Sequence, residues 1–190
     1  MNCNLILIFL SIVILVIVAS YDLNFFDYQP PIPYSNWKEI SWDDFKGRNK
    51  PYFTLDGEDK FAFISTQIEA HRTNDGYFEI TTYFHPSRSY VFNQRIIDNA
   101  LLKHELYHLH ITETIARFMR QEISTSRKSR LLDISKVLST FQVKEDSMQR
   151  AYDVQTYHGY LLNKQKYWQK TIDSCLFSLE KFSDAVVKIK

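Results

Sequence analysis

Two histidines and a glutamate near the middle of the chain have the spacing of a metal-dependent hydrolase. The sequence reads His104-Glu105-Leu106-Tyr107-His108 inside a run with helical periodicity. Because helical residues four apart lie on one face, His104 and His108 can direct their imidazoles at a single ion. Glu105 projects beside that ion, where a carboxylate can take a proton from water. The spacing therefore predicts a Zn²⁺ site with Glu105 as general base.

A catalytic zinc needs a third protein ligand and one open position for water. Glu113 is close in sequence, but it lies nine residues after His104, about 180° around a straight helix, which directs it away. His158 belongs to a later segment with helical periodicity, and Gly159 beside it would allow a close approach of two backbones. We predict His158 as the third ligand, with Asp153 as the carboxylate alternative.

Other polar residues of these segments are candidates for supporting roles. A ligating imidazole normally donates its second N–H to an oxygen, so Glu113, Asp153 or Thr156 can orient the histidines. Arg117 follows Glu113 by one turn and is placed to pair with it. The candidate phenols for stabilising the oxyanion of an acyl-transfer reaction are Tyr107, Tyr152 and Tyr157.

A short antiparallel sheet is expected before these helical segments. Residues 21–60 have no regular pattern, whereas 61–71 and 77–85 alternate apolar and polar side chains with the period of a strand. Between the two strands, Thr73-Asn74-Asp75-Gly76 has the composition of a tight turn. We therefore predict a β-hairpin.

After Pro86 the apolar residues recur every three or four positions, the period of an amphipathic helix. Strands followed by helices predict an α+β fold, a small antiparallel sheet and then three long helices. The His-Glu-x-x-His motif falls on the first of them, a zincin-like active-site helix. The predicted helices cover about 93–124, 129–158 and 161–188.

The N-terminal residues form a separate region. Residues 5–19 carry no charge, and the only polar residue among them is Ser11. This run is short for a spanning helix, which needs about 20 apolar residues, and fits the hydrophobic region of a signal peptide. No Lys or Arg precedes it, so an uncleaved membrane anchor is the alternative to cleavage after Ser20. We predict residues 1–20 as signal peptide or anchor and 21–190 as one exported domain, periplasmic or secreted.

Composition limits the classes of partner. The 190 residues include 23 Lys and Arg against 22 Asp and Glu, a net charge of +1, so no global field attracts nucleic acid. Of the 2 cysteines, only Cys175 would follow a cleaved signal. A single thiol forms no internal disulfide, so the core or a metal must stabilise the domain.

The motifs resemble a bacterial family of predicted secreted zinc-dependent proteases, catalogued as domain of unknown function 922. The resemblance implies a zinc peptidase-like site acting on a peptide or protein, and it favours the second helical motif as part of that site. The chain departs from the family pattern at Leu106, Leu109 and His110. The matching positions are Leu102-Lys103-His104-Glu105-x-x-His108 with Ile111, Glu113, Ala116 and Arg117, then Tyr152-Asp153-x-x-Thr156-x-His158-Gly159, Gln165-x-x-Trp168, Trp42-x-Asp44-Phe45-x-Gly47 and Ser89-Tyr90.

Two functions follow from these observations. The first is an exported zinc metallopeptidase that hydrolyses amide bonds. The second is a non-enzymatic cell-envelope binding module with a structural or degenerate zinc site, in which the Pro- and Trp-rich segment 30–42 contacts a partner.

Overall fold

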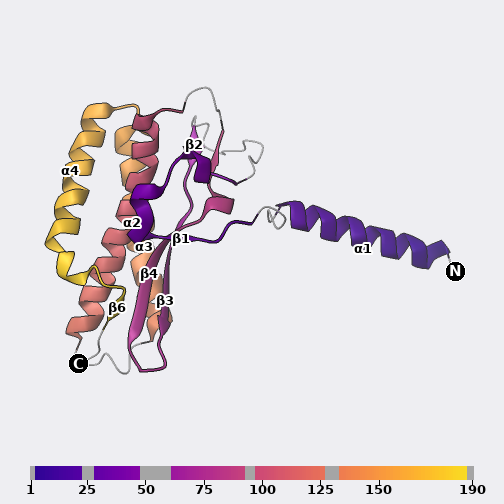
Figure 1. Ribbon diagram of the computed structural model, residues 1–190, viewed down its shortest axis with the longest axis horizontal. Helices are drawn as coiled ribbons and strands as arrows, with labels where there is room; N and C mark the ends of the chain where they lie inside the picture. Colours follow the sequence, from indigo (N-terminus) through magenta and orange to yellow (C-terminus); the bar gives the residue numbers. More distant parts are fainter. Residues whose placement is uncertain (1–2, 23–27, 48–60, 93–96, 127–132, 188–190) are drawn as a thin grey trace.

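The computed structural model describes residues 3–22, 28–47, 61–92, 97–126 and 133–187. Within these ranges an antiparallel sheet packs against helices, which confirms the predicted α+β class. Figure 1 shows the sheet on one side of α2 (Asn99–Thr125), with α4 (Leu162–Ser178) on the other. The long helix that carries the histidine motif is therefore central.

The predicted hairpin is formed by β3 (Thr66–Arg72) and β4 (Phe78–Phe84), which pair antiparallel from Thr66↔Phe84 to Arg72↔Phe78. The turn between them closes with a hydrogen bond from Gly76 N–H to the Thr73 carbonyl at 3.0 Å, and Gly76 has φ +82°. A left-handed conformation there suits glycine, which confirms the turn.

Two short strands that periodicity did not predict complete this sheet. β1 (Ile32–Pro33) pairs with one end of β4, and β6 (Val186–Val187) pairs with the other, giving the order β1-β4-β3 with β6 beside β4. Residues 32–33, expected in an irregular region, are thus an edge strand.

The predicted strand over 61–71 is divided in two. β2 (Ala62–Phe63) pairs with β5 (Tyr90–Val91), whereas β3 pairs with β4. The division falls at Ser65, whose N–H donates to Ser89 Oγ at 2.9 Å instead of continuing the ladder. This break places residues 64–66 over α2, where the cavity described below opens.

The three predicted helices are present, with shorter bounds. α2 begins after Asp98, whose carboxylate accepts the Leu101 N–H at 2.7 Å, and α3 (Ile134–Thr156) begins after the capping residue Asp133. α4 ends at Ser178 instead of continuing to 188, and a short 3-10 turn (Glu180–Phe182) leads into β6. The apolar residues after 178 therefore belong partly to the sheet.

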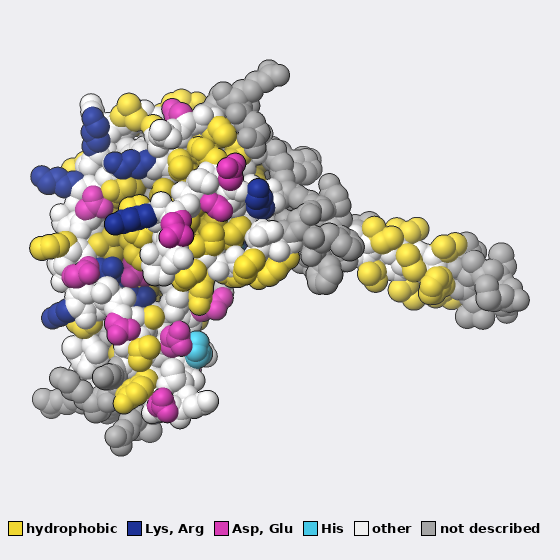
Figure 2. Space-filling view, viewed as in Figure 1, with side chains coloured by type: hydrophobic (Ala, Val, Ile, Leu, Met, Phe, Trp, Pro, Cys, Tyr) yellow, Lys and Arg dark blue, Asp and Glu magenta, His cyan; other side chains and the backbone are white. Residues whose placement is uncertain are grey.

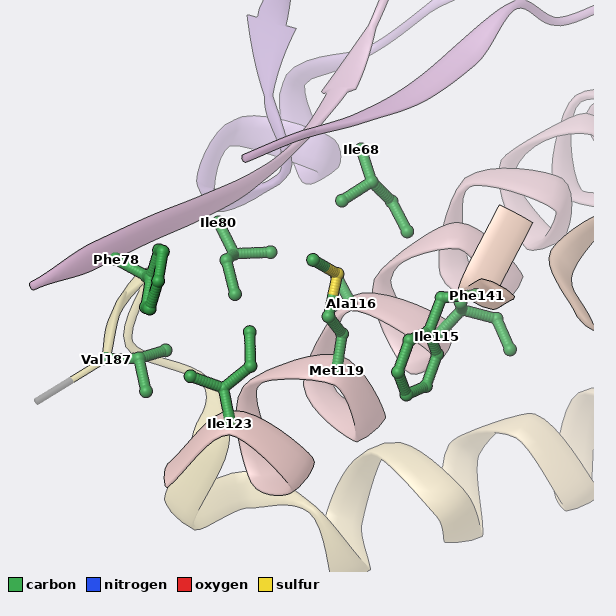
Figure 3. Close-up of a cluster of buried hydrophobic side chains, with 9 residues drawn as sticks. All are labelled: Ile68, Phe78, Ile80, Ile115, Ala116, Met119, Ile123, Phe141 and Val187. Atoms are coloured by element: carbon green, nitrogen blue, oxygen red, sulfur yellow. The ribbon is translucent and has the colours of Figure 1, made fainter. Parts of the chain in front are cut away.

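α2 packs on both sides. Toward the sheet, its second half meets β3 and β4 in the cluster drawn in Figure 3, which comprises Ile68, Phe78, Ile80, Ile115, Ala116, Met119, Ile123, Phe141 and Val187. Toward α3 and α4 it contributes Tyr107 and Ile111 to a smaller cluster with Tyr152 and Ile172. Burial on two faces fixes the helix, and with it the direction of its histidines.

α1 (Cys3–Asp22) projects away from the rest of the molecule in Figure 1. Figure 2 shows hydrophobic side chains on the visible face of this helix. Ile8, Phe9, Ile14 and Leu15 are each more than half exposed. Among the described residues, no helix has both the length and the hydropathy required to cross a membrane.

Candidate metal centre

His104 and His108 lie one turn apart on α2 and face the C-terminal end of α3. Asp153, from that end, places its Oδ1 3.3 Å from His104 Nε2 and 2.9 Å from His108 Nε2. One ligand atom from each of the three residues lies within 4.8 Å of the other two. This group could hold a metal ion.

The two separations between Asp153 and the histidines are compatible with a small tetrahedral ion. Zinc binds imidazole nitrogen and carboxylate oxygen at about 2.0–2.2 Å, so neighbouring donors in a tetrahedron stand roughly 3.3 Å apart. The oxygen–nitrogen distances of 3.3 and 2.9 Å are close to that edge. Two imidazoles and one carboxylate also form a donor set that zinc accepts.

His158 stands next to this group. Its Nδ1 lies 3.5 Å from Asp153 Oδ1, so a single carboxylate oxygen is approached by three imidazoles. The sequence predicted that both Asp153 and His158 lie near the His-Glu-x-x-His motif. The set of mutually close donors contains Asp153, the predicted alternative ligand, whereas His158 contacts the metal group through Asp153.

The segment that carries His158 is a turn and not the helix expected from periodicity. α3 ends at Thr156, and Tyr157, His158 and Gly159 have φ of 50°, 51° and 90°. Left-handed backbone at two successive non-glycine residues is uncommon and costs about 1 kcal/mol or more at each. The turn reverses the chain so that His158 returns to the end of α3 beside Asp153.

Gly159 permits a close approach, as the sequence predicted, although its neighbour is a side chain and not a second backbone. A Cβ on Gly159 would lie 3.1 Å from His104 Cγ and 3.4 Å from Gln165 Oε1. Together with its φ of 90°, this contact restricts the position to glycine.

Gln149 orients His108, a role that the sequence did not reveal. Its Nε2 donates to the His108 carbonyl at 2.9 Å and to Thr112 Oγ1 at 3.1 Å, which leaves Oε1 2.6 Å from His108 Nδ1. Because a carbonyl oxygen only accepts, Nδ1 carries the proton and Nε2 faces Asp153. The available signal was the i, i+4 spacing of Glu145, Gln149 and Asp153 along one face of α3.

Glu105 lies in the same cavity as the histidines. This cavity has a volume of about 270 Å³, is bounded by residues 61–66 on the sheet side and by α3 opposite, and contains Glu105, Glu145 and Asp146 along with the metal group. Burial raises the pKa of Glu105 to about 7, and a hydrogen bond with the Ile64 backbone opposes the rise. A carboxyl with that pKa can both accept and release a proton near neutral pH.

The three groups of the metal centre have very different proton affinities. Burial lowers the pKa of His104 to about 4. Burial would also lower the pKa of His108, but the adjacent Asp153 charge outweighs it and raises this pKa to about 9. Burial opposes ionisation of Asp153, yet the positive charge of His108 and the histidine hydrogen bonds hold its pKa far below the usual range. In the metal-free protein an ionised Asp153 therefore faces a protonated His108.

Several predicted supporting residues lie away from the metal group. Glu113 is buried in ion pairs with Arg117 Nε at 2.9 Å and Arg120 Nη1 at 2.8 Å, which confirms the Arg117 pair. Its position, about half a turn around the helix from His104, excludes a ligand role. Thr156 Oγ1 donates to the Tyr152 carbonyl at 2.7 Å, within α3, and does not orient a histidine through a described bond.

The predicted phenols also act elsewhere. Tyr152 is fully buried, stacks on the His104 ring with centroids 4.7 Å apart, and directs its hydroxyl to the His104 carbonyl at 3.4 Å. Tyr157 is 64% exposed and does not line the cavity. Tyr107 donates to the Asp173 carboxylate at 2.9 Å. Tyr152 therefore supports His104 from behind, and none of the three faces the cavity as an oxyanion donor.

Comparison with protein-family models, curated proteins and solved structures finds no match for this chain.

Proposed function

We propose that the protein is an exported zinc-dependent metallopeptidase that hydrolyses amide bonds. The observation that supports this most is the position of Glu105, a buried carboxyl whose pKa is raised to about 7, in one cavity with the His104–His108–Asp153 group.

His104, His108 and Asp153 would hold the zinc. A zinc ion in such a site lowers the pKa of bound water toward about 7 and polarises a substrate carbonyl. Gln149 keeps His108 in the tautomer whose Nε2 faces the ion, and Tyr152 fixes the His104 ring by stacking. The ligands are thus held by contacts from α3 before any substrate arrives.

Glu105 would perform the proton transfers. It accepts a proton from the water that attacks the carbonyl carbon and donates one to the departing amine nitrogen. In the metal-free protein burial favours the acid form of Glu105. The charge of a bound zinc ion would favour the carboxylate, which must be available first, and the acid forms once the proton is taken up. Residues 64–66 line the cavity on the side opposite α3.

A specific observation also favours the second function, a non-enzymatic module with a structural zinc. His158 Nδ1 lies 3.5 Å from Asp153 Oδ1. If His158 ligated together with Asp153, four protein donors would close the coordination shell and leave no position for water.

Five single substitutions test the proposal and separate it from this alternative. Glu105→Gln is expected to retain one zinc per chain by metal analysis and to lose at least about 100-fold in cleavage of a mixed peptide substrate. His158→Ala is expected to retain zinc, whereas His104→Ala, His108→Ala and Asp153→Ala lose it. Wild-type protein without stoichiometric zinc, or undiminished cleavage by Glu105→Gln, would refute the enzyme. Loss of zinc in His158→Ala would favour the closed, structural site.

A further inference from the structure

Two buried polar atoms near the metal centre have no hydrogen-bond partner among the described residues. They are His104 Nδ1 and Gln165 Oε1, and both side chains are almost completely buried. Leaving either group unpaired is unfavourable, because a buried donor or acceptor has given up its hydrogen bonds to water. Each atom therefore calls for an explanation.

The two side chains lie against the same glycine. The position of a Cβ on Gly159 would be 3.1 Å from His104 Cγ, the atom bonded to Nδ1, and 3.4 Å from Gln165 Oε1. Gln165 belongs to α4, so the loop through Gly159 and the first turn of α4 bring its amide beside α2.

The direction of the Gln165 amide is fixed. Its Nε2 donates to the Ala100 carbonyl, one turn before His104, at 3.3 Å. A carbonyl requires a donor, so the nitrogen must face Ala100 and the oxygen is the atom left over. Gln165 thus presents an acceptor without a donor.

His104 presents the complementary group when it binds a metal. Its Nε2 faces Asp153 Oδ1 at 3.3 Å, so Nε2 is the ligating atom and the ring proton must be on Nδ1. A ligating histidine almost always donates this second N–H to an oxygen. His108 already does so, to Gln149 Oε1 at 2.6 Å, whereas His104 has no such bond.

We propose that Gln165 is the positioning residue for His104: its Oε1 accepts the Nδ1–H, directly or through one water held against Gly159, when zinc is bound. Each ligating histidine would then be oriented by a glutamine from a neighbouring helix, His108 by α3 and His104 by α4. This inference rests on the proposed zinc site, and it assigns to Gln165 a role in zinc affinity.

The test measures zinc affinity by chelator competition with the full chain. Gln165→Met removes the acceptor at similar size and is expected to weaken zinc binding about 10- to 100-fold. Gln165→Glu keeps an acceptor oxygen for His104 but, like Gln165→Met, lacks the donor to the Ala100 carbonyl, so it should bind zinc more tightly than Gln165→Met. The matched control is Gln169→Met, because Gln169 is also buried on α4 one turn later and does not contact Gly159. This control should bind zinc like wild type.

Wild-type affinity in Gln165→Met would overturn the role of Gln165, and equal losses in Gln165→Met and Gln165→Glu would do the same. If Gln165→Met does not fold, ¹⁵N NMR of the zinc-loaded wild-type protein decides: the proposal requires a protonated, slowly exchanging His104 Nδ1, and ligation through Nδ1 or a rapidly exchanging proton would contradict it. A wild-type chain that binds no zinc refutes the proposed function itself, a distinct result.

Discussion

At the scale of single residues, the proton on His108 opposes metal binding. The Asp153 charge, acting against burial, raises the pKa of His108 to about 9, and a ligating imidazole must be neutral. Each metal ion bound below pH 9 therefore displaces one proton from His108. His104, with a pKa lowered by burial to about 4, contributes none above pH 6.

We predict that zinc affinity rises about tenfold per pH unit from pH 7 to pH 9 and then levels off, as measured by chelator competition. The same shift affects stability. Because the folded pKa of His108 lies above its usual 6.5, its contribution is present below pH 6.5 and is lost as pH rises through 9. The contribution of Glu105 to stability is lost as pH rises to about 7, because its folded pKa is about 7. A further loss of stability between pH 7 and 9 in the metal-free protein therefore belongs to His108. An affinity that is constant above pH 7.5 would contradict this prediction.

The sequence was sufficient to identify those site residues that lie close together along the chain. His104, Glu105 and His108 are linked by helical geometry alone, so their spacing sufficed. The contacts of Gln149 and Gln165 with the histidines depend on how α3 and α4 pack against α2. The spacing of Gln149 and Asp153 indicates only that they share a face of α3, not which histidine that face meets. His158 was located correctly near the motif, but its turn conformation was not predicted, since left-handed Tyr157 and His158 run against their intrinsic preferences.

At the scale of elements, a buried ion cluster joins α2 to the sheet and to the chain after α4. Glu113 pairs with Arg117 and Arg120, and Arg120 also donates to the Ile80 carbonyl of β4 at 2.8 Å and the Phe182 carbonyl at 3.0 Å. Glu113 and Arg120 are 2% and 3% exposed. Removing the carboxylate would leave two buried guanidinium groups without their shared partner.

Glu113→Gln is therefore predicted to lower the free energy of unfolding by about 3–5 kcal/mol in denaturant titrations. The matched control is Glu180→Gln, since Glu180 pairs with Arg117 at 2.8 Å but its side chain is 70% exposed; its loss should cost less than about 1 kcal/mol. Because the cluster is separate from the cavity, folded Glu113→Gln should bind zinc like wild type. If Glu113→Gln kept its stability but bound zinc more weakly, Glu113 would have to be counted among the residues of the metal centre.

Elements were predictable where periodicity extends over several turns or alternations. The β3–β4 hairpin and the three helices met that condition. β1 and β6 have two residues each, and they are strands only because β4 offers its edge to both. For the same reason the third helix was predicted too long: apolar residues near 186–187 serve the sheet with a pattern too short to distinguish from a helix.

At the scale of the whole molecule, α1 stands apart from the domain that holds the site. Its apolar side chains are exposed, and no other part of the described structure covers them (Figure 2). The first described contacts with the domain after α1 are made by Gln29, whose N–H donates to Ser87 Oγ at 2.6 Å, and by β1, which joins the sheet. Removal of residues 1–20 would therefore leave these attachments intact.

We predict that this segment directs export when the full chain is expressed in a bacterium. Protease added to spheroplasts should digest the domain of the full-length chain, and a chain lacking residues 5–19 should be protected inside the cell. The mass of the recovered protein then distinguishes cleavage after Ser20 from retention as an anchor, because cleavage leaves 170 of the 190 residues. Since only Cys175 would remain, export needs no disulfide formation, and zinc would be acquired outside the cytoplasm. A full-length chain that stays protected from protease would overturn export while leaving the metal centre untouched.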